Sequence, residues 1–197
     1  MKTLGLGILG SGKGSNCRAI LESIRAGKVP AEARVVISDV LDAPILDIAR
    51  EFQIPNAYLP PGQFRTRLEP HAETGLVQML RDAGVDLVVL AGFMRVLKST
   101  TLEAFPRRII NIHPSLLPKF PGLEAWKQAL DAGEKVTGCT VHYVDDKIDH
   151  GDVIAQCEVP ILPNDTTESL HARIHAAEHE LYPSVIAKIC QESNSAA

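Results

Sequence analysis

The chain has 197 residues, of which 45% are hydrophobic, and this length and composition predict one compact domain with a packed core. The formal net charge of −4 argues against broad electrostatic binding to nucleic acid, which requires a clustered basic surface. No apolar run approaches the roughly 20 residues that span a bilayer, and the N-terminal stretch lacks the small-residue cleavage site of a signal peptide. We therefore expect a cytoplasmic protein with no membrane partner.

Apolar runs of strand length alternate with helical patterns through the first two thirds of the chain, which indicates a parallel sheet with crossover helices. Strands are expected at Leu4–Gly10, Ala33–Ser38, Asn56–Leu59, Asp86–Gly92 and Arg108–Pro114. Helices are expected at Ser15–Ala26, at Pro44–Phe52, from about Arg67 to Ala83, and at Leu123–Ala132.

The last third of the chain has a different pattern. Two strand-like runs, Lys135–Asp146 and Asp152–Leu162, are separated only by the stretch KIDHG, so they are expected to pair antiparallel because parallel neighbours need a longer crossover. A final helix over Thr167–Cys190 is expected to be kinked or divided at Pro183 and to be followed by a frayed tail, 191–197. The predicted fold is a single-domain, Rossmann-like α/β structure with a mostly parallel mixed sheet, a C-terminal antiparallel hairpin and helices on both faces. The apolar stripe expected on the final helix is Leu170, Ile174, Ala177 and Leu181.

The stretch GILGSGKGSN matches two glycine patterns, each incompletely. Residues 7–13 fit the spacing of a P-loop, but Gly14 stands where that loop needs a Ser or Thr to bind Mg²⁺. Residues 5–10 fit the dinucleotide pattern, but they lie inside the first strand rather than at the turn after it. Asp39, at the end of the second strand, stands where a ribose-binding acid would be, so a nucleotide- or NAD-binding module remains an alternative.

The turn that follows the first strand is the better candidate for a ligand site. Gly12 and Gly14 allow backbone N–H groups to converge, and the start of the next helix adds positive partial charge, so a phosphate can be held there without a metal. The simpler alternative is a turn that only begins the helix. Open α/β sheets bind ligands at this edge, which favours the phosphate site.

The stretch NIHPSLLPKFPG carries the predicted catalytic groups. Asn111 and His113 are two residues apart on a strand, so both side chains leave the same face, where an amide and an imidazole can stabilise an oxyanion and manage a proton. The acidic run at 144–152 can supply a carboxylate that keeps His113 protonated. That run lacks the order of an EF-hand loop, and the four cysteines show no metal-ligand spacing. We therefore expect no metal, and reduced, mostly buried thiols.

Five segments, GSGKGSN, LAGFMRVL, NIHPSLLPKFPG, HYVDDKIDHGDVI and AEHELYP, occur in an order and spacing that resemble the phosphoribosylglycinamide formyltransferase family over nearly the whole chain. The resemblance implies the transfer of a formyl group from 10-formyltetrahydrofolate to the amine of glycinamide ribonucleotide in purine synthesis, with no metal. It implies that Asn111, His113 and Asp149 are the catalytic trio. It also implies small-molecule substrates, no nucleic-acid partner and a possible homodimer.

The same resemblance assigns the two substrates to residues. It implies a ribonucleotide site that includes Gly12, Gly14, Ser15, Asn16 and Glu178. It implies a folate site formed by Arg67, Met94, Arg95, Val96, Leu97, Asn111, Val144 and Asp145. Within the single domain 1–197, we expect residues 1–100 to form the ribonucleotide-binding half and residues 101–190 the catalytic and folate-binding half.

Two residues depart from the pattern of many relatives, and a third, His175, lies where some relatives place a basic residue. Trp126 stands where many have a histidine, and Asp152 stands where proline or alanine is frequent. His175, one helical turn before Glu178, either assists the phosphate or is a solvated residue on the helix face. The other histidines are expected to be structural or exposed: His71, His142, His150, His171 and His179.

Two other formyltetrahydrofolate enzymes remain as alternatives, a deformylase and a methionyl-tRNA formyltransferase. Both carry an additional domain, for which a chain of 197 residues is expected to have no room.

Overall fold

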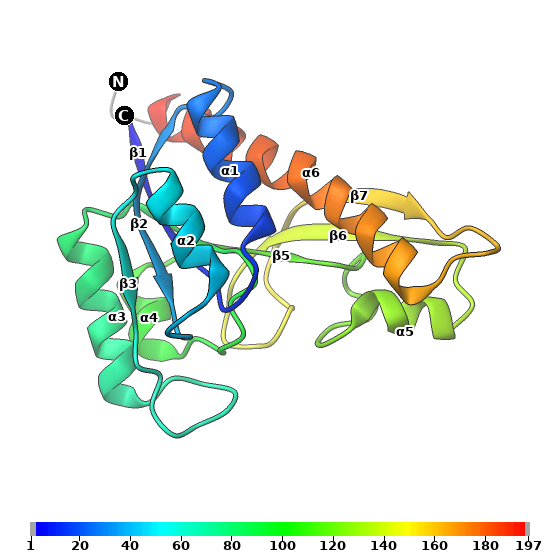
Figure 1. Cartoon of the computed structure of the whole chain (residues 1–197), viewed down its shortest axis with the longest axis horizontal. Coiled ribbons are helices and arrows are strands. Elements are labelled where there is room, and N and C mark those ends of the chain that lie inside the picture. Colours follow the sequence, from blue (N-terminus) through cyan, green and yellow to red (C-terminus); the bar gives the residue numbers. More distant parts are fainter. Residues whose placement is uncertain (1–2, 196–197) are drawn as a thin grey trace.

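A seven-stranded mixed sheet runs through the middle of the molecule, with helices on both of its faces (Figure 1). The computed structural model describes residues 3–195. The strand order is β3-β2-β1-β4-β5-β6-β7. The strands are β1 (Leu4–Leu9), β2 (Ala31–Ser38), β3 (Asn56–Tyr58), β4 (Leu87–Leu90), β5 (Ile109–His113), β6 (Val136–Tyr143) and β7 (Val153–Pro160).

Strand pairing confirms the predicted mixed sheet. The first five strands pair in parallel, whereas β6 is antiparallel to both β5 and β7. The β5–β6 register places Asn111 opposite His142 and His113 opposite Thr140. The antiparallel strands therefore place side chains from the last third of the chain, including His142, beside Asn111 and His113 at the end of β5.

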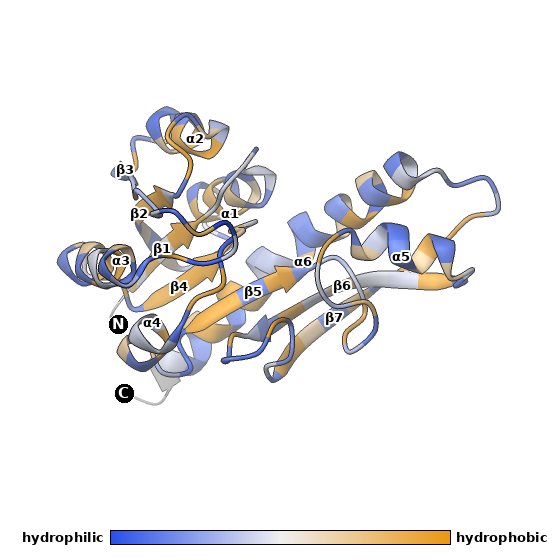
Figure 2. Ribbon diagram, turned by 90° about the horizontal axis from the view of Figure 1, so that it is seen from below, coloured by the Kyte–Doolittle hydropathy of each residue, from blue (hydrophilic) through white to orange (hydrophobic). Residues whose placement is uncertain are grey.

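The helices divide into two layers, as the view along the sheet shows (Figure 2). Apolar residues of α1, α2 and α6 share one core cluster with one face of the sheet, and residues of α3 pack in a second cluster on the other face. Among residues 3–195, no helix is both long enough and apolar enough to cross a membrane. The helices are α1 (Ser15–Arg25), α2 (Pro44–Glu51), α3 (Pro70–Asp82), α4 (Ser99–Ala104), α5 (Ala125–Asp131) and α6 (Thr167–Ser195).

Helix α6 differs from its prediction in two ways. It continues without a break through Pro183 to Ser195, so residues 191–195 are helical rather than frayed, and 196–197 lie outside the described residues. Its fully buried positions are Leu170, Ile174, Tyr182, Ile186 and Cys190, and Glu178 is 4% exposed in the same i, i+4 line. The predicted stripe instead included Ala177 and Leu181, which are only partly buried. A carboxylate therefore occupies a core position of the helix.

Two other elements depart from the sequence prediction. Helix α3 begins at Pro70 rather than near Arg67, because Arg67 is drawn into an isolated parallel bridge with Val96. The six-residue helix α4 was not predicted. Its start is held by a buried carboxylate from α3, since Glu73 Oε1 accepts hydrogen bonds from the Lys98 amide at 2.5 Å and the Thr101 hydroxyl at 3.1 Å.

All four cysteines are free thiols, three of them buried and Cys157 partly exposed. Cys139 and Cys157 are register partners on β6 and β7 but form no disulfide. Burial raises the pKa of the Cys17 thiol to about 12, which keeps it in the unreactive protonated form.

Candidate active site

The carboxyl ends of β1, β4 and β5 lie next to one another and carry three of the predicted site segments. The chain leaves β1 towards β2 on one side, while β4 lies on the other, which makes β1/β4 the point where the strand order reverses. The Ser11 amide donates a 2.9 Å hydrogen bond to the Gly92 carbonyl and ties the two strand ends together. Ligands of open α/β sheets bind at such switch points.

The glycine loop, residues 11–16, leads directly into α1. Gly14 is the residue before the helix and has φ +74°, and a Cβ there would approach Ile45 to 2.8–3.0 Å, so glycine is required on both counts. No side chain caps the helix, which begins at Ser15. Its first N–H groups therefore lack a side-chain cap, and an uncapped helix start of this kind can bind an anion.

Asn16 and Glu178 meet between α1 and α6, although they are 162 residues apart in sequence. Asn16 Nδ2 donates to Glu178 Oε2 at 2.9 Å, and both side chains are buried. Asn16 Oδ1 is buried without a hydrogen-bond partner. Because buried polar atoms are nearly always satisfied, this oxygen marks a place where a ligand can donate a hydrogen bond. Burial raises the pKa of Glu178 to about 7, against the opposing effect of the Asn16 hydrogen bond.

This raised pKa predicts a pH-dependent stability. Between pH 4.5, the ordinary value, and about 7, the folded protein holds a proton on Glu178 that the unfolded chain has released. The free energy of unfolding therefore falls as pH rises through this window, by up to roughly 3 kcal/mol. Glu178→Gln should remove the fall, so the variant should gain stability over the native protein at pH 8 but not at pH 4. Denaturant unfolding at both pH values measures this difference in the free energy of unfolding.

Glu180→Gln, at an exposed neighbour on α6, is the control and should leave the pH dependence of stability unchanged. Parallel pH curves for all three proteins would contradict the assignment.

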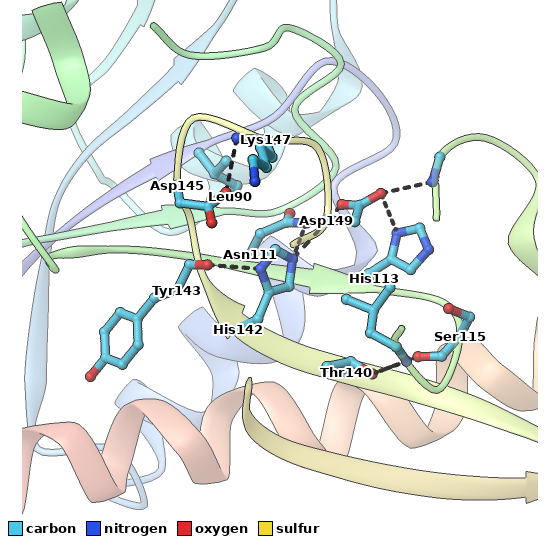
Figure 3. A network of polar contacts seen from close by, with 12 residues as sticks. Leu90, Asn111, His113, Ser115, Thr140, His142, Tyr143, Asp145, Lys147 and Asp149 are labelled. Carbon is cyan, nitrogen blue, oxygen red and sulfur yellow. Dashed lines mark hydrogen bonds and ion pairs between the residues drawn. The ribbon is translucent and has the colours of Figure 1, made fainter. Parts of the chain in front are cut away.

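The structure brings His113 and Asp149 together beside Asn111 (Figure 3). His113 Nδ1 lies 3.3 Å from Asp149 Oδ2, and both side chains are nearly buried. The other ring nitrogen, Nε2, lies 2.8 Å from the Phe120 carbonyl. Since both ring nitrogens face oxygen acceptors, only the doubly protonated imidazolium can donate to both.

A rigid loop and a tight turn hold this pair in place. Asp149 has φ +51°, and its Oδ2 also accepts a 2.8 Å hydrogen bond from the Gly122 amide. A Cβ on Gly151 would lie 1.9 Å from the Tyr143 carbonyl oxygen, so the turn closes against β6 only with glycine. Across the described residues, no cluster of three or more His, Cys, Asp or Glu side chains is arranged to hold a metal ion.

His142 belongs to this site, and the sequence prediction of a structural or exposed histidine missed it. It is 2% exposed, and its Nε2 lies 3.2 Å from Asn111 Nδ2 and 3.8 Å from Asp149 Oδ1. Its Nδ1 lies 2.9 Å from the Tyr143 carbonyl, so the Nδ1–H tautomer donates there and Nε2 accepts from the amide. Burial lowers the pKa of His142, which favours this neutral form. The ring thereby orients the Asn111 amide.

The predicted folate residues lie on two sides of the same edge. The segment 94–97 follows β4, and the Val96 amide donates to the Thr66 carbonyl at 2.8 Å, beside the Arg67–Val96 bridge. Met94 is 58% exposed, whereas Leu97 is buried. Val144 and Asp145 follow β6, and the Val144 amide donates to the Ile109 carbonyl at 2.9 Å.

Residues that depart from the family pattern lie around α6 and the final hairpin. The Trp126 ring stacks on His171 at 3.7 Å between centroids, and His175 continues the column 4.0 Å further on. Burial, the two neighbouring histidines and Lys13 lower the pKa of His175 to about 4, so it is neutral at pH 7 in the free protein. Asp152 forms an exposed ion pair with Arg107 at 2.8 Å.

Comparison with known proteins agrees with this geometry. The family model described as formyl transferase matches residues 6–186. The phosphoribosylglycinamide formyltransferase of Bacillus subtilis is 41% identical over 187 residues, which cover 95% of each chain. The crystal structure of glycinamide ribonucleotide transformylase 1 from Symbiobacterium toebii is 46% identical, with a TM-score of 0.92 over 96% of this chain and 89% of that one.

A longer protein also carries this sequence pattern. The trifunctional purine biosynthetic protein adenosine-3 of Drosophila melanogaster is 45% identical over 184 residues, which are 92% of this chain but only 14% of that protein. The chain thus matches a small part of that relative, but 95% of the bacterial one. A family match over residues 6–186, together with close identity across full-length relatives, shows that the chain belongs to the formyl transferase family.

Proposed function

We propose that this protein transfers the formyl group of 10-formyltetrahydrofolate to the amine of glycinamide ribonucleotide, as the names of its full-length relatives indicate. One observation carries the proposal beyond the names: the His113–Asp149 pair stands beside the Asn111 amide at a sheet edge. A cationic donor and an amide donor together suit a reaction in which negative charge develops on a formyl oxygen.

In this reaction His113 and Asn111 stabilise the negative charge that develops on the formyl oxygen, and Asp149 orients His113. The Nε2–H that bonds to the Phe120 carbonyl in the free protein is the donor we expect to turn to the formyl oxygen, since catalytic hydrogen bonds often form only with substrate bound. His142 occupies one hydrogen of the Asn111 amide and directs the other outward. Asp149 orients the His113 ring through Nδ1, and a water beside it can carry the proton from the attacking amine to the leaving nitrogen.

The ribonucleotide is assigned to the glycine loop and to the buried pair behind it. Its phosphate suits the uncapped start of α1 at Ser15, where amides and the helix dipole favour a dianion. Asn16 Oδ1, which lacks a partner, accepts a hydrogen bond from the sugar or the amide of the substrate. Glu178, which is half protonated near pH 7, either donates or accepts there. Glu178, assigned to the ribonucleotide, comes from the second half of the chain. Met94–Leu97, assigned to the folate, comes from the first half. Each proposed substrate site therefore contains residues from both halves.

The folate is assigned to the surface between segment 94–97 and the Val144–Asp145 turn. Burial acts to raise the pKa of Asp145, but hydrogen bonds from the Lys147 amide at 2.9 Å and the His150 ring at 3.1 Å outweigh it, so the pKa is lowered. The carboxylate is thus held in the turn. We also propose a cytoplasmic location and a homodimer, the latter by analogy with some relatives.

The test is to mix the protein with 10-formyltetrahydrofolate and to follow the folate absorbance with and without glycinamide ribonucleotide. We expect turnover only when the ribonucleotide is present. Turnover without it would identify a deformylase, and turnover only with methionyl-tRNA would identify that formyltransferase. An NAD-binding module would give no turnover, and it is disfavoured because both carboxylate oxygens of Asp39 are already bonded within the protein.

A further inference from the structure

Asp39 is a buried carboxylate that the proposed reaction does not use. It follows β2, and its side chain is 2% exposed. Oδ1 accepts a hydrogen bond from the Ser11 hydroxyl at 2.5 Å, and Oδ2 accepts one from Arg95 Nε at 2.6 Å. A buried charge is tolerated only when it is paired and hydrogen-bonded. Here both partners lie on loops at the sheet edge where the two substrates are assigned.

The Ser11 hydroxyl extends this contact to the folate segment, Met94–Leu97. While it donates to Asp39, it also accepts the Met94 amide at 2.8 Å. A hydroxyl whose proton is drawn to a carboxylate is a stronger acceptor, because hydrogen bonds in a chain polarise one another. The first residue of the folate segment is thus bonded to the first residue of the glycine loop.

Arg95 connects Asp39 to the loop that precedes α3. Its Nη1 donates to the Phe64 carbonyl and, at 2.6 Å, to the Arg65 carbonyl. Its side chain is 16% exposed. The planar guanidinium therefore joins one carboxylate to two carbonyls, an arrangement that a lysine cannot reproduce.

We propose that Asp39 is a positioning residue that holds the folate segment and the 64–67 loop against the glycine loop. This inference rests on the proposed function, because it assigns the segment to folate. Asp39 touches neither substrate; it acts through Ser11 and Arg95. The glycine loop and Gly10, which precedes it, also have backbone bonds that do not depend on Asp39: the Gly10 amide donates to the Ile37 carbonyl at 3.1 Å, and the Ser11 amide donates to the Gly92 carbonyl at 2.9 Å. Loss of the carboxylate should therefore loosen the folate side more than the phosphate side.

The experiment measures binding of a stable deaza analogue of 10-formyltetrahydrofolate and of glycinamide ribonucleotide by calorimetry. Asp39→Ala should raise the Kd for the folate analogue about tenfold or more and leave the ribonucleotide Kd within about twofold, since the folate segment loses buried hydrogen bonds to a charged group while the glycine loop keeps its backbone bonds. Asp39→Asn keeps a carbonyl acceptor for Arg95 and should restore most of the affinity. Hydrogen exchange at the Met94 amide should speed up in Asp39→Ala.

Asp165→Ala is the matched control, because Asp165 is also nearly buried and paired with an arginine, Arg173, at 2.6 Å. It should lower stability and leave both Kd values unchanged. Equal effects of Asp39→Ala on both ligands, or none on either, would overturn the inference.

If Asp39→Ala does not fold, Ser11→Ala removes the same link to Met94 and must show the same selective loss of folate affinity. If the native protein does not bind the folate analogue, the proposed function fails, while the Met94 exchange still tests the bridge.

Discussion

Replacing His113 with alanine is expected to lower kcat by about 10³-fold while changing the Kd for glycinamide ribonucleotide by less than about threefold. The imidazolium acts on charge that develops in the transition state, and such groups contribute roughly 10²–10⁴-fold. It does not lie in the glycine loop, so ground-state binding of the phosphate is unaffected. Steady-state kinetics and calorimetry of the same preparation measure the two quantities.

Asp149→Asn should produce nearly the same loss, and the double variant should lose little more than either single one. The two residues act as one unit, because Asp149 Oδ2 is the partner of His113 Nδ1. His71→Ala, at a largely exposed histidine on α3, is the control and should retain full activity. Additive losses in the double variant would show that the two groups act separately.

Ser15→Asp is expected to have the opposite effect, with the Kd for glycinamide ribonucleotide raised at least about 100-fold and the fold intact. A carboxylate at the first residue of α1 is favourable for the helix itself. The same charge repels a phosphate dianion at the same N–H groups, and like charges about 4 Å apart near a protein surface cost roughly 4 kcal/mol. Calorimetry and thermal unfolding separate the two effects.

Thr167→Asp is the matched control, because it adds the same charge at the first residue of α6. It should leave ribonucleotide binding unchanged. Ser15→Ala should cost much less than Ser15→Asp, since the backbone amides remain. An equal loss in the alanine variant would mean that the hydroxyl, rather than the charge environment, holds the phosphate.

Much of the fold could be predicted from local pattern because most elements carry a strong one. β1 and α1 are separated by a glycine-rich turn, and the β6–β7 hairpin has too short a connection to be parallel. Helix α4 was missed because six residues show no helical period, and its start is held by Glu73, a residue distant in sequence. Helix α6 passes Pro183 undivided because burial of residues on both sides of it outweighs the lost hydrogen bond.

Spacing along one strand predicts only the part of the candidate site that lies on β5. Asn111 and His113 share a face because strand side chains alternate. The position of His142 depends on the β5–β6 register, and no local pattern determines it. The sequence leaves a ribose-binding acid open as an alternative for Asp39, because it does not show that Ser11 and Arg95 already occupy its two oxygens.

Tyr182 joins α6 to the central strands, so the packing of this sheet face depends on a helix that is synthesised after the strands. Its buried hydroxyl lies 3.0 Å from the Leu90 carbonyl and 3.1 Å from the Ile110 carbonyl, one helical turn beyond Glu178. Until α6 leaves the ribosome, the sheet face that it covers is open to water, and Asn16 has no carboxylate to meet. The contacts that α1 and the sheet make with α6 can therefore form only after α6 has been synthesised. We expect burial of this sheet face and closure of the Asn16–Glu178 hydrogen bond to occur together.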